Sequence, residues 1–280
     1  SCGADHEGVP MLREKLIDRH STTARHEFRW RSREISRLEG LSDAVFGFAV
    51  TLLIVALEVP RTSGELLEAM RGFVSFALTF SILYLLWYRQ FTFFRRYGLE
   101  DRTTAILNGA LLFVVLFFVF PLKFVLGWAV NRLMGGGKTI RLPNGTVEKV
   151  ILPEHVTPML TVYGLGIAAV FALFALLHLH AYHRRKELRL TELERLDTLQ
   201  DLQSYVASAG IGLLTVVYSN VVGLVDKTPY ELQGTLAVSA VFFLAMMAIL
   251  KRRMKRKRQR QQLVERLIAE GALPQGDPEE

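Results

Sequence analysis

Long apolar runs alternate with short polar segments along the whole chain. Six of these runs are long enough to cross a bilayer as helices, which takes about 20 mostly apolar residues each. They are predicted at about residues 40–59, 67–91, 104–130, 156–182, 202–225 and 232–250. The pattern therefore predicts an all-α polytopic membrane protein with six transmembrane helices.

The connection between the third and fourth spans, residues 131–155, differs from the other connections. It contains the segment KTIRLPNGTVEKVIL, in which Asn144 and Gly145 separate two runs of alternating character. An Asn-Gly pair between such runs favours a two-residue turn. We therefore predict a small external β-hairpin that turns at Asn144 and Gly145.

Lysine and arginine are distributed unevenly over the connections. Of the 34 such residues, 26 lie in residues 1–37, 89–102, 184–195 and 251–266, which share one side if both termini do. Cytoplasmic segments carry the excess of positive charge in membrane proteins. We therefore expect both termini in the cytoplasm. The predicted domains are a basic N-terminal tail (1–38), a six-span transmembrane domain (39–252) and a basic C-terminal tail (253–280).

The net charge of +7 does not indicate a nucleic-acid-binding protein, because the basic run from Lys251 to Arg260 directly follows an apolar span. The single cysteine, Cys2, excludes a disulfide framework within the chain. Half of the residues are hydrophobic. Composition therefore adds to the prediction of a membrane protein.

The histidines at the end of the fourth span are the clearest candidates for chemistry. His180 and His183 share a helical face, and His178 lies close by, so they could bind a metal or serve an intramembrane enzyme. They stand beside arginines, as interfacial histidines often do, and no loop groups a serine, a histidine and an acid. We therefore predict that the protein is not an enzyme and carries no metal or cofactor.

The first span has a distinctive arrangement of residues. The segment from Arg37 to Glu58 reads RLEGLSDAVFGFAVTLLIVALE. On a helix, one stripe of this segment is apolar in the middle and charged at both ends. It consists of Ala44, Phe48, Thr51 or Leu52, Val55 and Glu58. Such a stripe suits a pore with a hydrophobic constriction, and it equally suits ordinary packing in a helix bundle.

The same segment resembles a known signature. Arg37, Ser42 and Asp43 match the Arg-x-x-x-Phe-Ser-Asp opening of the first helix in the endosomal and lysosomal potassium channel family. Further matches are Trp87, Asn108 and Pro121, so the resemblance to the bacterial members covers about 90 residues. Two positions depart from it, since Leu41 replaces an aromatic residue and Gln90 stands where the family usually has a histidine.

The resemblance implies a potassium-permeable cation channel of the bacterial inner membrane. Four identical subunits would surround a pore lined by the first helix, with potassium ions as the permeant species and modest preference over sodium. No nucleic acid or small-molecule substrate is expected. By the resemblance, Phe48, Leu52 and Val55 form the constriction, and Thr51 contributes to selectivity. The motif residues Arg37, Ser42 and Asp43 would be supported by Trp87, Gln90 and Asn108.

Two other classes of function stay open at this point. A secondary transporter usually contains internal repeats, but nothing after residue 155 resembles the RLEGLSD segment. A non-conducting membrane scaffold would show the same spans. Saturable, substrate-coupled flux would identify a transporter, whereas a scaffold would carry no current.

Overall fold

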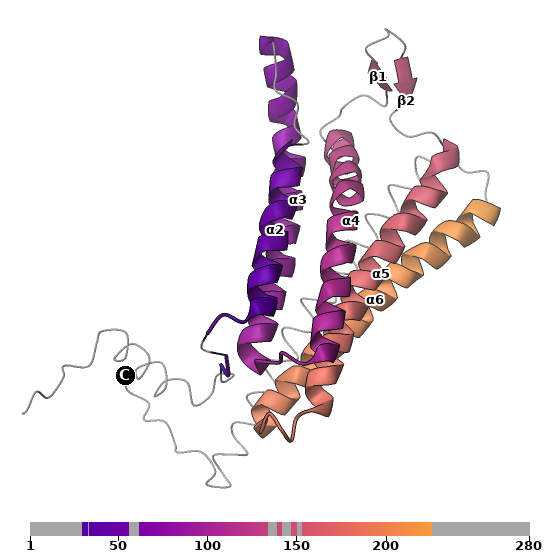
Figure 1. Ribbon diagram of the computed structural model, residues 1–280. Coiled ribbons are helices and arrows are strands. Elements are labelled where there is room, and N and C mark those ends of the chain that lie inside the picture. Colours follow the sequence, from indigo (N-terminus) through magenta and orange to yellow (C-terminus); the bar gives the residue numbers. More distant parts are fainter. Residues whose placement is uncertain are drawn as a thin grey trace, which may run out of the picture.

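The computed structural model describes residues 30–32, 34–55, 62–133, 139–141, 147–149 and 153–225. These residues form long helices and two short strands (Figure 1). The helices are α2 (Arg37–Val55), α3 (Ser63–Tyr97), α4 (Arg102–Leu133), α5 (Pro153–His183) and α6 (Glu192–Val225), and the strands are β1 (Thr139–Arg141) and β2 (Val147–Lys149).

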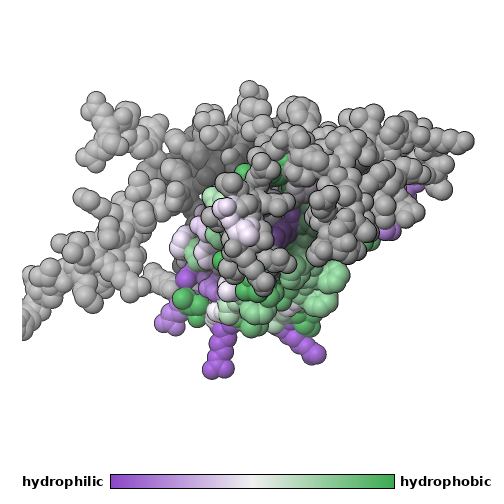
Figure 2. Space-filling model, turned by 90° about the horizontal axis from the view of Figure 1, so that it is seen from above, coloured by the Kyte–Doolittle hydropathy of each residue, from purple (hydrophilic) through white to green (hydrophobic). Residues whose placement is uncertain are grey.

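Five described helices are long and apolar enough to cross a membrane, as predicted for the first five spans. The sixth predicted span, residues 232–250, lies outside the described residues. Many large apolar side chains are exposed on the outer surface of the helices. In the view from above, hydrophobic residues gather on the part of this surface that is not covered by grey atoms (Figure 2). On α4 they form one stripe with steps of three or four residues: Phe113, Phe117, Phe120 and Phe124. Such a surface suits contact with lipid.

Local polar contacts define several helix ends. At the start of α2, the Ser36 hydroxyl accepts a hydrogen bond from the Glu39 amide. Gly98, with φ of 58°, follows the last residue of α3, a position that favours glycine. At the start of α6, Thr191 and Glu194 each accept a hydrogen bond from the other's amide. This capping box explains why α6 begins at Glu192, about ten residues before the predicted span.

Strands β1 and β2 pair antiparallel, with Ile140 opposite Glu148. They lie at the end of the bundle opposite the α3–α4 and α5–α6 connections (Figure 1). The turn predicted at Asn144 and Gly145 falls outside the described residues and stays a prediction.

Helices α5 and α6 pack closely along their length. A Cβ atom on Gly212 would lie 2.7 Å from both the Ala168 nitrogen and the Gly164 oxygen, so the two backbones are nearly in contact. Gly166 of α5 likewise accommodates the ring of Phe118 from α4. Small residues permit such close approach between membrane helices. This packing joins α4, α5 and α6 on one side of the molecule, while α2 contacts α3 and α4.

Candidate functional site

Helix α2 has two distinct faces. Glu39, Ser42, Phe46, Ala49 and Leu53 are buried, and their spacing of three and four residues puts them on one side of the helix. This side contacts α3 and α4. The orientation of α2 is therefore fixed by its own subunit, which leaves a defined second face directed outward.

Most of the predicted pore residues lie on the outward face. Ala44, Phe48, Thr51 and Val55 are exposed, with 57% of Phe48 and 75% of Val55 accessible. Leu52 differs, because it is partly covered by the subunit. Glu58 falls outside the described residues. Within the described helix, the stripe inferred from the sequence thus corresponds to the uncovered side of α2, apart from Leu52.

The side chain of Thr51 is oriented by its own helix. Its hydroxyl donates a hydrogen bond to the Gly47 carbonyl, one turn earlier, at 2.7 Å. A hydroxyl has one proton and two lone pairs, so this bond leaves the oxygen able to accept. Thr51 therefore presents an acceptor on the exposed face of an otherwise apolar segment.

Ser42 is the centre of a buried polar cluster that joins three helices. Its hydroxyl donates to the Leu38 carbonyl at 2.7 Å. It accepts hydrogen bonds from the side-chain amides of Gln90 on α3 and Asn108 on α4, each at 2.9 Å. Gln90 also donates to the Asn108 carbonyl oxygen. The cluster fixes α2 against both neighbours, because the buried amides find few alternative partners.

Gln90 occupies the position of the histidine expected from the resemblance. Its Oε1 atom is buried and has no hydrogen-bond partner among the described residues. An amide can replace a histidine as a hydrogen-bond donor, but it does not titrate. The central cluster of this chain therefore keeps one protonation state at all physiological pH values.

Asp43 makes a second contact between α2 and α3. The indole nitrogen of Trp87 donates to its carboxylate at 2.7 Å. Trp87 also belongs to a row of neighbouring rings along α3, which runs from Phe73 through Phe76, Phe80, Tyr84 and Trp87 to Phe91. Arg37, by contrast, is exposed at the start of α2 and does not join Ser42 and Asp43 in these contacts within the described residues.

Two anchoring contacts near the start of α2 were missed by the sequence reasoning. Glu39 is buried and pairs with Arg95 of α3, with Oε1 and Nε 3.1 Å apart. Arg31, ahead of the helix, binds Glu194 of α6 through both carboxylate oxygens, at 3.1 and 2.6 Å. A carboxylate in the first turn of a membrane helix was the available signal for Glu39. The local sequence gave no comparable signal for Arg31.

Lys123 contacts the opposite end of α2. Its ammonium group lies 3.4 Å from the Leu53 carbonyl, in the last described turn. This contact links α4 to the last described turn of α2.

The histidines near residue 180 are separated by their contacts. His178 is buried, with Nδ1 2.9 Å from the Phe174 carbonyl. His180 points instead to Asp101, with Nε2 and Oδ2 2.9 Å apart. Across the described residues, no group of three potential ligands is arranged to hold a metal ion. His178 and His180 are therefore directed to different partners in the described structure.

Asp101 lies between α3 and α4, outside the spans. Partial burial tends to raise its pKa. Hydrogen bonds from Thr104 and His180, with the positive charges of His180 and Arg184, outweigh that effect and lower the pKa below its usual value. The ionised carboxylate thereby connects the start of α4 to the end of α5.

Sequence comparisons relate the chain to known channels. The family model described as endosomal/lysosomal potassium channel TMEM175 matches residues 37–118. A potassium channel of Marivirga tractuosa is 32% identical over 190 residues, which cover 68% of this chain and 76% of that relative. A potassium channel of Chamaesiphon minutus is 31% identical over 96 residues, covering 31% of this chain and 47% of that relative.

Structural comparisons agree with these relationships. The crystal structure of a variant of the potassium channel MtTMEM175, in complex with a nanobody–MBP fusion protein, matches with a TM-score of 0.67 and 29% identity. The match covers 82% of this chain and 97% of that one. A homologue, from Chamaesiphon minutus, of the lysosomal potassium-selective channel TMEM175 matches in fold with a TM-score of 0.50 and 21% identity, over 79% and 99% of the two chains. The chain is therefore a multi-pass membrane protein that belongs to the TMEM175 family of potassium channels.

Proposed function

We propose that this chain is the subunit of a potassium-permeable cation channel in which four copies surround a pore lined by α2. The observation that carries the proposal is the uncovered face of α2. The opposite face is fixed by Ser42 and by the buried apolar residues, so the outward face keeps its direction in every copy. Family membership supports potassium as the permeant ion.

The composition of the outward face favours a pore over a lipid contact. Alongside Phe48 and Thr51 it carries Gly40, Ala44 and Gly47, and nothing lies within 4 Å of a Cβ atom built on either glycine. Small residues allow helices of neighbouring copies to approach closely. The exposed stripe of α4 consists of phenylalanines alone, whereas α2 combines its small residues with the exposed Leu41, Phe48, Ile54 and Val55. This contrast supports copies of α2 meeting around a shared axis.

In the proposed pore, Phe48 and Val55 form an apolar constriction, with Leu52 at its edge. A narrow apolar neck favours loss of water and can gate conduction. Thr51 contributes one hydroxyl oxygen per copy between these rings, where a partly dehydrated cation would pass. Selectivity for potassium over sodium is modest, because hydroxyl oxygens replace only part of a hydration shell.

The channel is proposed to lie in the bacterial inner membrane with both termini in the cytoplasm. The supporting observation is that Arg95, Arg96 and Arg184 gather at the bundle end that carries the α3–α4 and α5–α6 connections.

Electrical recording of the purified protein in planar bilayers tests the proposed function. Under a potassium gradient we expect discrete currents that reverse near the potassium equilibrium potential, and a shift when sodium replaces potassium on one side. Silence at all voltages, from protein shown to be folded, would remove the channel proposal and favour a scaffold. Saturable flux coupled to a substrate would favour a transporter.

A further inference from the structure

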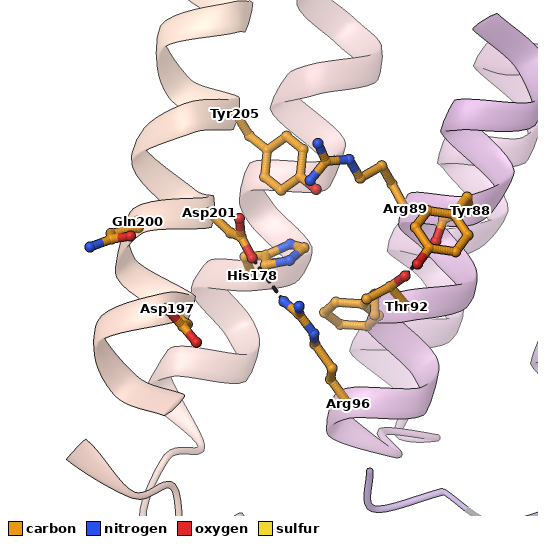
Figure 3. Close-up of a pocket in the computed structure, with 10 residues that line it drawn as sticks. Tyr88, Arg89, Thr92, Arg96, His178, Asp197, Gln200, Asp201 and Tyr205 are labelled. Carbon is orange, nitrogen blue, oxygen red and sulfur yellow. Dashed lines mark hydrogen bonds and ion pairs between the residues drawn. The ribbon is translucent and has the colours of Figure 1, made fainter. Parts of the chain in front are cut away.

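A polar pocket of about 280 Å³ lies between α3, α5 and α6, away from the outward face of α2. Figure 3 shows its arrangement, with Arg89 and Arg96 extending from α3 toward Asp201 and Tyr205 on α6. The rings of Phe93, His178 and Tyr205 are neighbours on one wall, with centroids 5.2 Å apart for Phe93 and His178 and 4.8 Å for His178 and Tyr205. The pocket therefore combines an aromatic wall with charged side chains.

The charges in this pocket are not equally compensated. Arg96 pairs with Asp201, with Nη1 and Oδ2 3.0 Å apart. Arg89 takes part in no ion pair within the described part of the chain. Its guanidinium lies beside the Tyr205 hydroxyl, toward which it extends across the pocket (Figure 3). A guanidinium offers five N–H donors, of which one hydroxyl can occupy few. Arg89 therefore retains donor capacity directed into the pocket.

Arg89 lies at a depth in the membrane where its free N–H groups would be near lipid headgroups. Arg89 precedes the last residue of α3 by eight positions, about 12 Å along the helix. It follows Trp87 and the exposed Tyr88, and such aromatic residues favour the membrane–water interface. An arginine within a membrane-spanning segment is costly without an anionic partner. A phosphate group at this depth would supply one.

We propose that the pocket binds a phosphate-bearing ligand, held by the Arg89 guanidinium and the Tyr205 hydroxyl. Arginine matches phosphate geometry with paired hydrogen bonds. The pocket's carboxylates do not oppose this placement, because Asp201 is neutralised by Arg96. Asp197 also lines the pocket, but it precedes Tyr205 by eight residues, or about 12 Å along the axis of α6. Lipid headgroups and free phosphate share the required chemistry, so experiment has to distinguish them.

Native mass spectrometry of the detergent-solubilised full chain tests this proposal with three probes. The probes are dioctanoyl phosphatidylglycerol, inorganic phosphate, and dioctanoylglycerol, which has the same tails but no phosphate. We expect the phosphate-bearing lipid, inorganic phosphate or both to bind, and dioctanoylglycerol not to bind. Binding of the lipid alone identifies a headgroup site, whereas displacement of the lipid by inorganic phosphate identifies a site for the phosphate group itself.

Variants attribute the binding to the pocket. R89Q is expected to weaken binding at least tenfold, and R89K less, because lysine keeps the charge but loses the paired geometry. R102Q is the matched control, since Arg102 is an exposed arginine at the start of α4, outside the pocket. Equal binding by the wild type and R89Q, equal loss in R102Q, or no binding of either phosphate probe would overturn the proposal. The readout does not depend on conduction, so it stands apart from the channel test.

Discussion

Thr51 places a hydroxyl in the middle of the outward face of α2, between exposed apolar neighbours. Its proton is bonded to the Gly47 carbonyl, so the oxygen acts as an acceptor. In the proposed pore this acceptor stabilises a partly dehydrated potassium ion. The contribution of Thr51 to selectivity can be isolated by removing the hydroxyl without changing side-chain shape.

We expect Thr51→Val to lower the potassium preference while leaving the protein folded. Loss of about 1 kcal/mol of differential ion binding would reduce the permeability ratio roughly fivefold. The measurement is the reversal potential with potassium on one side and sodium on the other. Thr51→Ser, which keeps the hydroxyl, should behave as the wild type. An unchanged reversal potential in Thr51→Val would remove Thr51 from the filter.

Ser42 contributes to the stability of the folded subunit. Ser42→Ala deletes the oxygen that accepts from Gln90 and Asn108, leaving two buried amides short of a partner. Such a loss costs about 1–3 kcal/mol of unfolding free energy. Thermal unfolding in detergent should therefore show a lower midpoint. Ser81→Ala is the control, since the exposed Ser81 hydroxyl bonds its own helix at Ala77; equal effects of the two changes would contradict the prediction.

At the scale of elements, the contact between α5 and α6 depends on glycine. Gly212→Ala would place a methyl group 2.7 Å from backbone atoms of Gly164 and Ala168, so the helices must separate. We expect destabilisation of about 1–3 kcal/mol, as for other overpacked sites. Gly210→Ala, where nothing lies within 4 Å, should instead stabilise α6 by about 0.5–1 kcal/mol. Unfolding midpoints that move in the same direction for both variants would argue against this contact.

The helices differ in how well the sequence predicted them. Apolar length located the five described spans, because a bilayer requires that length whatever the side chains pack against. Helix α6 begins about ten residues before the predicted span, since its first turns are charged and lie outside the apolar run. The Thr191–Glu194 capping box was the overlooked signal. Polar residues that interrupt this span, such as Ser208, bond carbonyls of their own helix and so do not break it.

The candidate site was only partly predictable from the sequence. Helical periodicity identified the stripe of α2 that lies exposed, and the motif residues Ser42 and Asp43 indicated its anchored side. The partial burial of Leu52 and the pairing of Glu39 with Arg95 depend on where α3 and α4 lie. The positions of α3 and α4 depend on contacts between residues that are far apart in the sequence. The periodicity of a single helix carries no information about such contacts.

In the molecule as a whole, Asp101 forms a junction between the α3–α4 connection and the end of α5. It follows α3, accepts a hydrogen bond from the Thr104 hydroxyl at the start of α4, and pairs with His180 and Arg184 at the end of α5. Because its pKa is lowered in the folded protein, its stabilising contribution is complete above the unfolded value of about 3.9 and is lost as the pH falls through the folded value.

We therefore expect the wild-type unfolding midpoint to fall more steeply than that of Asp101→Asn as the pH is lowered below about 4. At pH 7 the variant should be the less stable of the two. Thermal unfolding over a pH series gives both comparisons, and Glu100→Gln, at an exposed neighbouring position, is the control. Parallel pH profiles for the wild type and Asp101→Asn would contradict the assignment of this junction.

The contacts of Arg31 determine how force on the N-terminal tail reaches the rest of the subunit. Its side chain bonds Leu188, Arg96 and Glu194, and its backbone amide bonds the Arg95 carbonyl. Tension that arrives from the preceding residues is therefore transferred to the base of α3 and α6 before it reaches Arg37. The proposed pore helix is shielded from forces on the N-terminal tail, so tethering or enlarging that tail should leave the direction of α2 unchanged.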